Sequence, residues 1–185
     1  MTHATYTNTQ MKKVHLILLL LICFFSFGTT QLFGQNSSAP KLCAYVFLSD
    51  ECPMCQGYAP VLNQLAKDYA QKGLRIIGVF PNYYVTDSAI VAFRKDYFIT
   101  FETRRDVGFT LSNRFEASIT PQVFLTNAKD ELLYAGQIDN AYFRAGKRRG
   151  TTSELYLRDA VEAILNGTKP TIEVTNAVGC VIVKN

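Results

Sequence analysis

Short apolar runs alternate along the chain with segments in which apolar residues recur every three to four positions. Runs of four to eight apolar residues are typical of strands that are covered on both faces of a sheet. They predict strands over residues 42–48, 74–80, 122–126 and 132–138. Helical spacing of the apolar residues predicts helices over residues 54–72, 87–97, 109–115 and 153–165.

Turn and capping residues agree with these bounds. Gly73 follows the first helix at the position of a C-cap glycine, and Thr86 or Asp87 can cap the start of the second. Residues 127–130 predict a turn, and residues 171–175 have strand character. The order of elements predicts an α/β fold with a mixed central sheet and helices on both faces.

The first residues carry a different pattern. Two lysines, Lys12 and Lys13, precede a nearly continuous apolar run over residues 14–25, and small and polar residues follow it. This order is typical of a secretory signal peptide, and the run is shorter than the roughly 20 residues of a membrane span. An uncleaved membrane anchor is the alternative. Met11 can be the true start, because the ten residues before it add nothing to a signal.

We therefore predict a signal peptide over residues 1–34, one domain over residues 35–166, and a C-terminal tail over residues 167–185. The length of 185 residues, with 48% hydrophobic and 18% charged residues, suits a single globular domain. Loss of the signal lowers the net charge from +4 to +2, because only two lysines leave with it. A charge this small does not indicate nucleic-acid binding.

Signal removal also takes both histidines, His3 and His15, and leaves four cysteines in a compartment where disulfides persist. Two of them form the motif Cys52-Pro53-Met54-Cys55 where a predicted strand gives way to a helix. A helix N-terminus stabilises a thiolate, and Cys55 lies one turn away. We hypothesise that Cys52 attacks a disulfide and that Cys55 resolves the mixed intermediate.

Other uses of this motif fit less well. A structural zinc site wants four ligands, and only one such pair is present. Haem attachment wants a histidine directly after the second cysteine, where Gln56 stands. A simple disulfide staple would close only a very small loop. We therefore expect no metal and no other cofactor.

Residues 47–61 (FLSDECPMCQGYAPV) resemble the active-site segment of the thioredoxin superfamily, and most closely its redoxin branch, which holds exported thiol–disulfide oxidoreductases and AhpC-TSA-like relatives. Residues 76–81, 119–124 and 133–138 resemble later segments of that branch, so the likeness covers about residues 42–166. It implies a thioredoxin fold with a C-terminal extension. It also implies that Pro121 is a cis-proline against the cysteines and that the backbone of Thr120 pairs with an extended substrate.

Some positions depart from the family pattern. Glu51 stands where thioredoxins carry tryptophan before the first cysteine, and Val46 stands where they carry a buried aspartate. Peroxiredoxins carry a proline and a threonine at fixed positions before their nucleophilic cysteine. Here Ser49 can take the place of the threonine, but Tyr45 stands where the proline should be. The resemblance implies an exported, periplasmic or secreted thiol–disulfide oxidoreductase. The alternatives are a thiol peroxidase and a non-enzymatic binding or metal-handling module.

The expected partners are protein or small-molecule thiols and disulfides and a further redox protein, and a membrane only if the signal is an uncleaved anchor. Residues 139–152 are basic and form either a surface that binds an acidic partner or a solvated loop.

Two cysteines lie outside the motif. Cys43 is expected to be a buried core thiol of the first strand. The dozen residues between Gly167 and Cys180 span up to about 40 Å, enough to cross the domain. We predict that Cys180 returns to Cys52 and Cys55 as a third thiol for relay or for soft-metal capture. A free tail cysteine, or one paired with Cys43, is the alternative.

Overall fold

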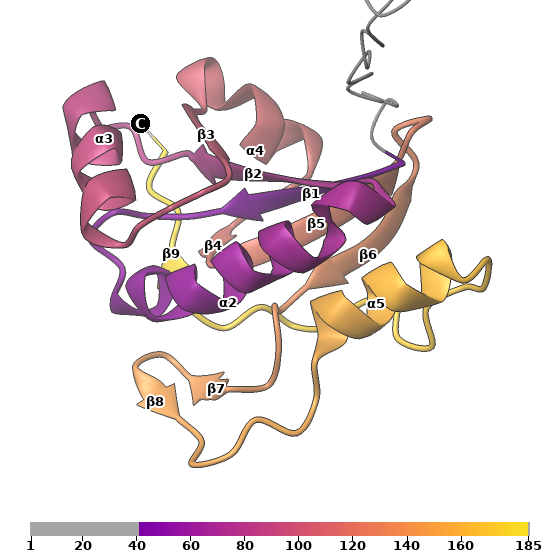
Figure 1. Ribbon diagram of the computed structural model, residues 1–185. Coiled ribbons are helices and arrows are strands. Elements are labelled where there is room, and N and C mark those ends of the chain that lie inside the picture. The colour runs from indigo at the N-terminus through magenta and orange to yellow at the C-terminus, as the bar shows by residue number, and fades with distance from the viewer. Residues whose placement is uncertain (1–40, 185) are drawn as a thin grey trace, which may run out of the picture. The chain divides into compact units, whose positions relative to one another are not determined.

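A five-stranded mixed sheet forms the centre of the protein in the computed structural model, which describes residues 41–184 (Figure 1). In spatial order the strands are β3 (Glu102–Arg105), β2 (Leu74–Phe80), β1 (Leu42–Phe47), β5 (Gln122–Asn127) and β6 (Leu132–Gly136). The first three run parallel, and β5 is antiparallel to both β1 and β6. The predicted signal segment lies outside the described residues.

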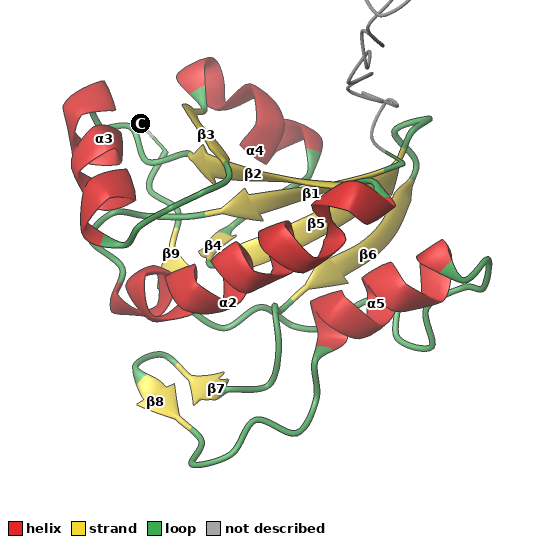
Figure 2. Cartoon of the chain, viewed as in Figure 1, coloured by secondary structure: helices red, strands yellow, loops and turns green. Residues whose placement is uncertain are grey.

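Helices cover both faces of this sheet (Figure 2). The helical elements are α2 (Pro53–Tyr69), η1 (Ala70–Lys72), α3 (Asp87–Asp96), η2 (Val107–Phe109), α4 (Thr110–Arg114) and α5 (Tyr156–Leu165). Apolar residues of α2, α3 and α5 share one cluster, and those of α4 belong to the other. Gly73 adopts the left-handed conformation at φ 101°, which a C-cap glycine provides without strain.

The two apolar clusters follow from the alternation of side chains along each strand. From β1, Ala44 and Val46 face the first cluster, together with Leu62 of α2 and Val161 of α5. Phe47 faces the second cluster, where Phe115, the residue that follows α4, packs against it. The predicted α/β class, mixed sheet and helices on both faces are confirmed.

Several elements differ from the prediction. The edge strand β3 has the sequence ETRR, which is entirely polar and gives no apolar signal. A hairpin of β7 (Tyr142–Arg144) and β8 (Lys147–Arg148) lies within the predicted connection. Helix α5 begins at Tyr156 instead of Ser153, because the amides of Ser153 and Glu154 donate hydrogen bonds to the Asn140 side chain at 3.0 and 3.2 Å.

The C-terminal segment, residues 171–184, is joined to the rest of the fold by backbone pairing. Val174 forms a parallel bridge with Ala135 of β6. Further on, β9 (Cys180–Val181) pairs antiparallel with β4 (Ile119–Thr120), and the chain then runs on toward α3 (Figure 1). Ile182 is buried in the second apolar cluster. Within residues 41–184, no helix has both the length and the apolar character that crossing a membrane requires.

Candidate active site

Cys52 is the N-cap residue of α2, a few residues after β1 ends. Its backbone is extended, and its carbonyl accepts the hydrogen bond of the Gln56 amide at 3.1 Å. Pro53 occupies the first helical turn, where a missing N–H costs little. The amides of Met54 and Cys55 therefore remain available to the Cys52 sulfur. The strand-to-helix junction of the motif is as predicted.

Hydrogen bonds lower the pKa of Cys52 from its ordinary value of 9.0 to about 5. The largest contribution comes from the side chain of Cys55. The side chain of Cys180 and the amides of Cys55 and Met54 add to it, while burial opposes them. Each of these donors favours the charged form of the sulfur. At neutral pH Cys52 is therefore a thiolate, the form that acts as nucleophile.

Cys55 has the opposite character. It is completely buried, and burial together with the neighbouring Cys52 raises its pKa well above 9.0. The Ser49 amide donates to its sulfur at 3.4 Å. Cys55 thus keeps its proton and donates it toward Cys52. We call Cys52 and Cys55 the cysteine pair.

The Thr120–Pro121 peptide bond is cis, as the resemblance implied. In its thiol form Cys52 donates to the Thr120 carbonyl at 3.5 Å, so Thr120 lies directly against the cysteine pair. Both Thr120 and Pro121 are buried. Burial of Thr120 is complete because β9 pairs with it.

Cys180 is the third cysteine of this site. It is the register partner of Thr120, whose hydroxyl donates to the Cys180 carbonyl at 3.4 Å. Its thiol lies near enough to Cys52 to help lower the pKa of Cys52, and its own pKa is raised to about 12 by burial first and by Cys52 second. The structure therefore brings Cys52, Cys55 and Cys180 together, and all three are free thiols. Among residues 41–184, no group of three or more His, Cys, Asp or Glu side chains is placed to hold a metal ion.

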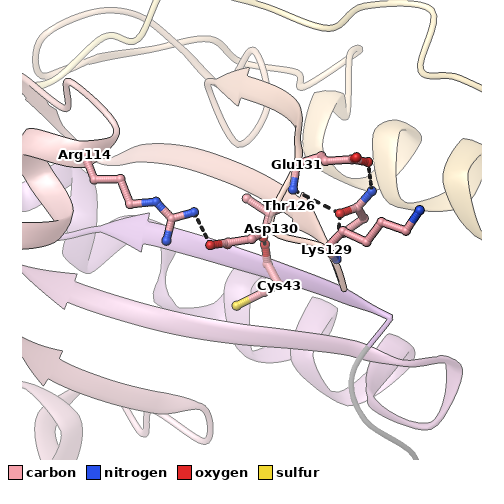
Figure 3. Close-up of polar contacts among 7 residues, drawn as sticks. Cys43, Arg114, Thr126, Lys129, Asp130 and Glu131 are labelled. Atoms are coloured by element: carbon pink, nitrogen blue, oxygen red, sulfur yellow. Dashed lines mark hydrogen bonds and ion pairs between the residues drawn. The ribbon is translucent and has the colours of Figure 1, made fainter.

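Cys43 lies elsewhere. It packs against the second apolar cluster, whereas Cys180 and the cysteine pair belong to the first. Figure 3 shows Cys43 beside Thr126, whose hydroxyl donates to the Cys43 carbonyl at 3.4 Å, and near the ion pair of Arg114 and Asp130. Cys43 is only partly buried, because its face of β1 is covered less fully than predicted. Pairing of Cys180 with Cys43 does not fit this arrangement.

Two polar residues near the pair take positions that the sequence pattern does not mark. Asn82 is buried after β2, donates to the Ser49 hydroxyl at 3.0 Å and accepts from the Val183 amide at 3.0 Å. It thus links the loop before Cys52 to the C-terminal segment. Asp50, in the loop before Cys52, has one buried carboxyl oxygen without a hydrogen-bond partner among the described residues. No local sequence signal marks either residue.

The hairpin of β7 and β8 lies beside α2. The ring of Tyr142 is 5.2 Å from that of Tyr58, and the Tyr58 hydroxyl donates to Asp139 at 2.6 Å. The hairpin and the residue after it present four exposed basic side chains, which are Arg144, Lys147, Arg148 and Arg149. The predicted basic connection is thus an exposed surface close to the N-terminal half of α2.

The depressed pKa of Cys52 predicts a specific pH dependence. The rate of Cys52 alkylation by iodoacetamide should stay constant at neutral pH and fall as the pH drops through about 5, because the thiolate is then protonated. A Cys55→Ala variant should move this midpoint upward, since the largest hydrogen bond is lost, whereas Cys43→Ser should not. Peptide mapping of the alkylated sites measures both. An unshifted midpoint in Cys55→Ala would contradict the assigned cause.

Comparisons with known proteins agree with this geometry. A family model described as thioredoxin-like matches residues 40–132. The crystal structure of a hypothetical protein from Sinorhizobium meliloti 1021 is similar with a TM-score of 0.68 and 28% identity, over 77% of this chain and 79% of that chain. An uncharacterized conserved protein from Geobacillus kaustophilus shares the fold with a TM-score of 0.70 and 20% identity, over 80% and 79%. No curated protein matches the sequence. The match to half of the chain, together with the mixed sheet and the cis-proline, shows that this protein belongs to the thioredoxin-like family.

Proposed function

We propose that the chain is an exported thiol–disulfide oxidoreductase in which Cys52 attacks and Cys55 resolves. The observation that carries this proposal is the contrast within the cysteine pair. The pKa of Cys52 is lowered to about 5, while that of Cys55 is raised far above its ordinary value. A pair with one ready thiolate and one protonated neighbour suits exchange in two steps. Thr120 and Pro121 would form the wall against which a client binds.

In the first step the Cys52 thiolate attacks one sulfur of a client disulfide. The client disulfide breaks, a mixed disulfide with Cys52 forms, and the second client sulfur leaves as a thiolate that takes a proton from solvent. The negative charge of Cys52 disappears at this point. Because that charge is one cause of the raised Cys55 pKa, Cys55 becomes easier to deprotonate.

In the second step Cys55 loses its proton and attacks the Cys52 sulfur. The mixed disulfide breaks, the client leaves with its second thiol, and Cys52 and Cys55 are joined by a disulfide. The client has gained two electrons and the cysteine pair has lost them. The reverse sequence would oxidise a client dithiol, and the relative reduction potentials decide the direction.

Export rests on the lysines and the apolar run over residues 12–25, which have the order of a signal peptide. N-terminal analysis of the protein from its native cell would locate the cleavage. A mature chain that starts near residue 35 and is recovered outside the cytoplasm supports the proposal, and an intact N-terminus in the cytoplasm contradicts it.

The activity itself is tested with a peptide that contains one disulfide, in the presence of dithiothreitol as the reductant. We expect the wild-type chain to accelerate reduction of the peptide at catalytic concentration, with a Cys52–Cys55 disulfide found after acid quenching. The same preparation is offered hydrogen peroxide. If the chain consumes peroxide rapidly but does not reduce the peptide, it is a thiol peroxidase and the proposal is wrong. If a properly folded chain consumes neither substrate, it is a binding module.

A further inference from the structure

The C-terminal segment is fixed to the fold on the approach to the cysteine pair. The Thr175 amide donates to Ala135 at 2.9 Å, and its hydroxyl accepts from the Gln137 amide at 2.8 Å. The Gln137 side chain donates to the Asn176 carbonyl at 2.6 Å. These contacts dock the segment along the edge of β6, so its course is set four residues before Cys180.

The segment is fixed again beyond Cys180. The Ile182 amide donates to the Ser118 carbonyl at 2.9 Å, and the Val183 carbonyl accepts from the Tyr83 amide at 3.2 Å. The Ile182 side chain is 7% exposed and fills part of the second apolar cluster. Cys180 is therefore held between two anchored stretches and is not a cysteine on a loose chain end.

Beside the cysteine pair, the backbone of the C-terminal segment lies directly against the backbone of Thr120. A Cβ atom at Gly179 would lie 2.1 Å from the Thr120 carbonyl oxygen, so the approach requires a glycine. The register then places Cys180 opposite Thr120, whose carbonyl lies 3.5 Å from the Cys52 sulfur, and Cys180 packs against the cluster that contains Cys52. Cys52, which lies beside this pairing, is 2% exposed. The position that an extended client would take beside Thr120 is thus filled by this chain's own strand.

We propose that the C-terminal segment is an internal substrate of the cysteine pair: β9 takes the place of the client strand, and Cys180 forms a disulfide with Cys52. This inference rests on the proposed attacking role of Cys52. It is carried by the joint placement of three thiols, the β4–β9 pairing and the near-complete cover of Cys52.

The step is an exchange that needs no outside oxidant. When Cys52 and Cys55 are joined, Cys180 gives up its proton and attacks the Cys52 sulfur. The Cys52–Cys55 bond breaks as the Cys52–Cys180 bond forms, and Cys55 leaves as a thiolate that takes up a proton. The number of disulfides and of protons is unchanged. Because Cys180 is already held at Cys52, the exchange is intramolecular and competes well with thiols in solution.

The test uses oxidised glutathione as the client and removes the first resolving thiol. In a Cys55→Ser variant, glutathione that attaches to Cys52 should be expelled by Cys180, and peptide mass spectrometry should find a Cys52–Cys180 disulfide. In the Cys55→Ser/Cys180→Ser variant, glutathione should stay on Cys52. We expect the glutathione-bearing fraction of Cys52 to be at least about tenfold lower in the single variant.

A Cys55→Ser/Cys43→Ser variant is the matched control, because Cys43 lies in the other apolar cluster, and it should behave like Cys55→Ser. Wild-type protein equilibrated in a glutathione buffer and quenched with acid should contain Cys52–Cys180 besides Cys52–Cys55. Equal retention of glutathione with and without Cys180, and no Cys52–Cys180 disulfide in the wild type, would overturn the internal-substrate proposal while Cys52 keeps its attacking role. Absence of glutathione from Cys52 in every variant would overturn the proposed function as well.

Discussion

A Cys52→Ser variant is expected to lose reduction of the disulfide peptide by at least about 1,000-fold, because a serine hydroxyl is neither ionised at neutral pH nor able to form a disulfide. The fold should persist, since serine is close to cysteine in size. Initial rates with dithiothreitol as the electron source measure the loss, and far-ultraviolet circular dichroism checks the fold. Cys43→Ser should keep the wild-type rate, because Cys43 lies outside the site.

The fate of the mixed disulfide separates the roles of the other two thiols. Replacement of Cys55 alone leaves Cys180 next to Cys52, so the peptide should still be released, more slowly than from the wild type. Replacement of both Cys55 and Cys180 by serine should leave the peptide attached to Cys52. Full activity in Cys52→Ser, or peptide trapped on Cys55 in the wild type, would show that the attacking sulfur is assigned to the wrong residue.

The sequence predicted the elements whose residues carry their own signal. Strand β2 has the predicted bounds, because a run that is apolar except for Arg75 is preceded by Gly73, whose φ of 101° stops the preceding helix. Helix α3 is capped by Thr86, whose hydroxyl accepts from the Ala89 amide at 3.2 Å. Strand β3 could not be found this way, since its polar residues become a strand only through pairing with β2.

In the candidate site, too, some features have a local sequence signal and others depend on contacts between distant residues. The spacing of Cys52 and Cys55 and the strand-to-helix junction are local, and the cis bond before Pro121 followed from the family resemblance. The position of Cys180 was only compatible with the length of the tail. Its register against Thr120 depends on contacts between residues far apart in sequence, above all Gly179 against the Thr120 carbonyl.

The same limit explains Asn82 and Asp50. Asn82 is an ordinary loop residue in the sequence, and it becomes a buried link only when the C-terminal segment brings the Val183 amide to it. Asp50 looks like a turn carboxylate, and its burial depends on how the loop before Cys52 packs. Hydrophobic periodicity says nothing about either, because both are polar residues in connections.

A Gly179→Val variant is expected to release β9 from β4, because the new Cβ would lie 2.1 Å from the Thr120 carbonyl oxygen and neither backbone can yield easily. Overpacking of this kind costs about 1–3 kcal/mol. Urea unfolding should show a lower free energy of unfolding. Cys52, now 2% exposed, should be alkylated about 5- to 100-fold faster, since each 1.4 kcal/mol changes an opening equilibrium about tenfold. At pH values where Cys52 is fully ionised, the alkylation rate depends on access to Cys52 and no longer on its pKa. Rates compared in this range therefore separate the gain in access from any change in the Cys52 pKa.

Gly150→Val is the matched control, since a Cβ at Gly150 meets nothing within 4 Å and the residue is exposed. It should leave both the unfolding curve and the alkylation rate near those of the wild type. Cys180→Ser is the complementary control: it keeps Gly179 and the backbone pairing, so Cys52 should stay covered although the disulfide with residue 180 is impossible. If Gly179→Val alkylates no faster than Gly150→Val, the cover over Cys52 comes from other parts of the fold. If Cys180→Ser alkylates as fast as Gly179→Val, the thiol of Cys180, and not the strand that carries it, holds the C-terminal segment in place.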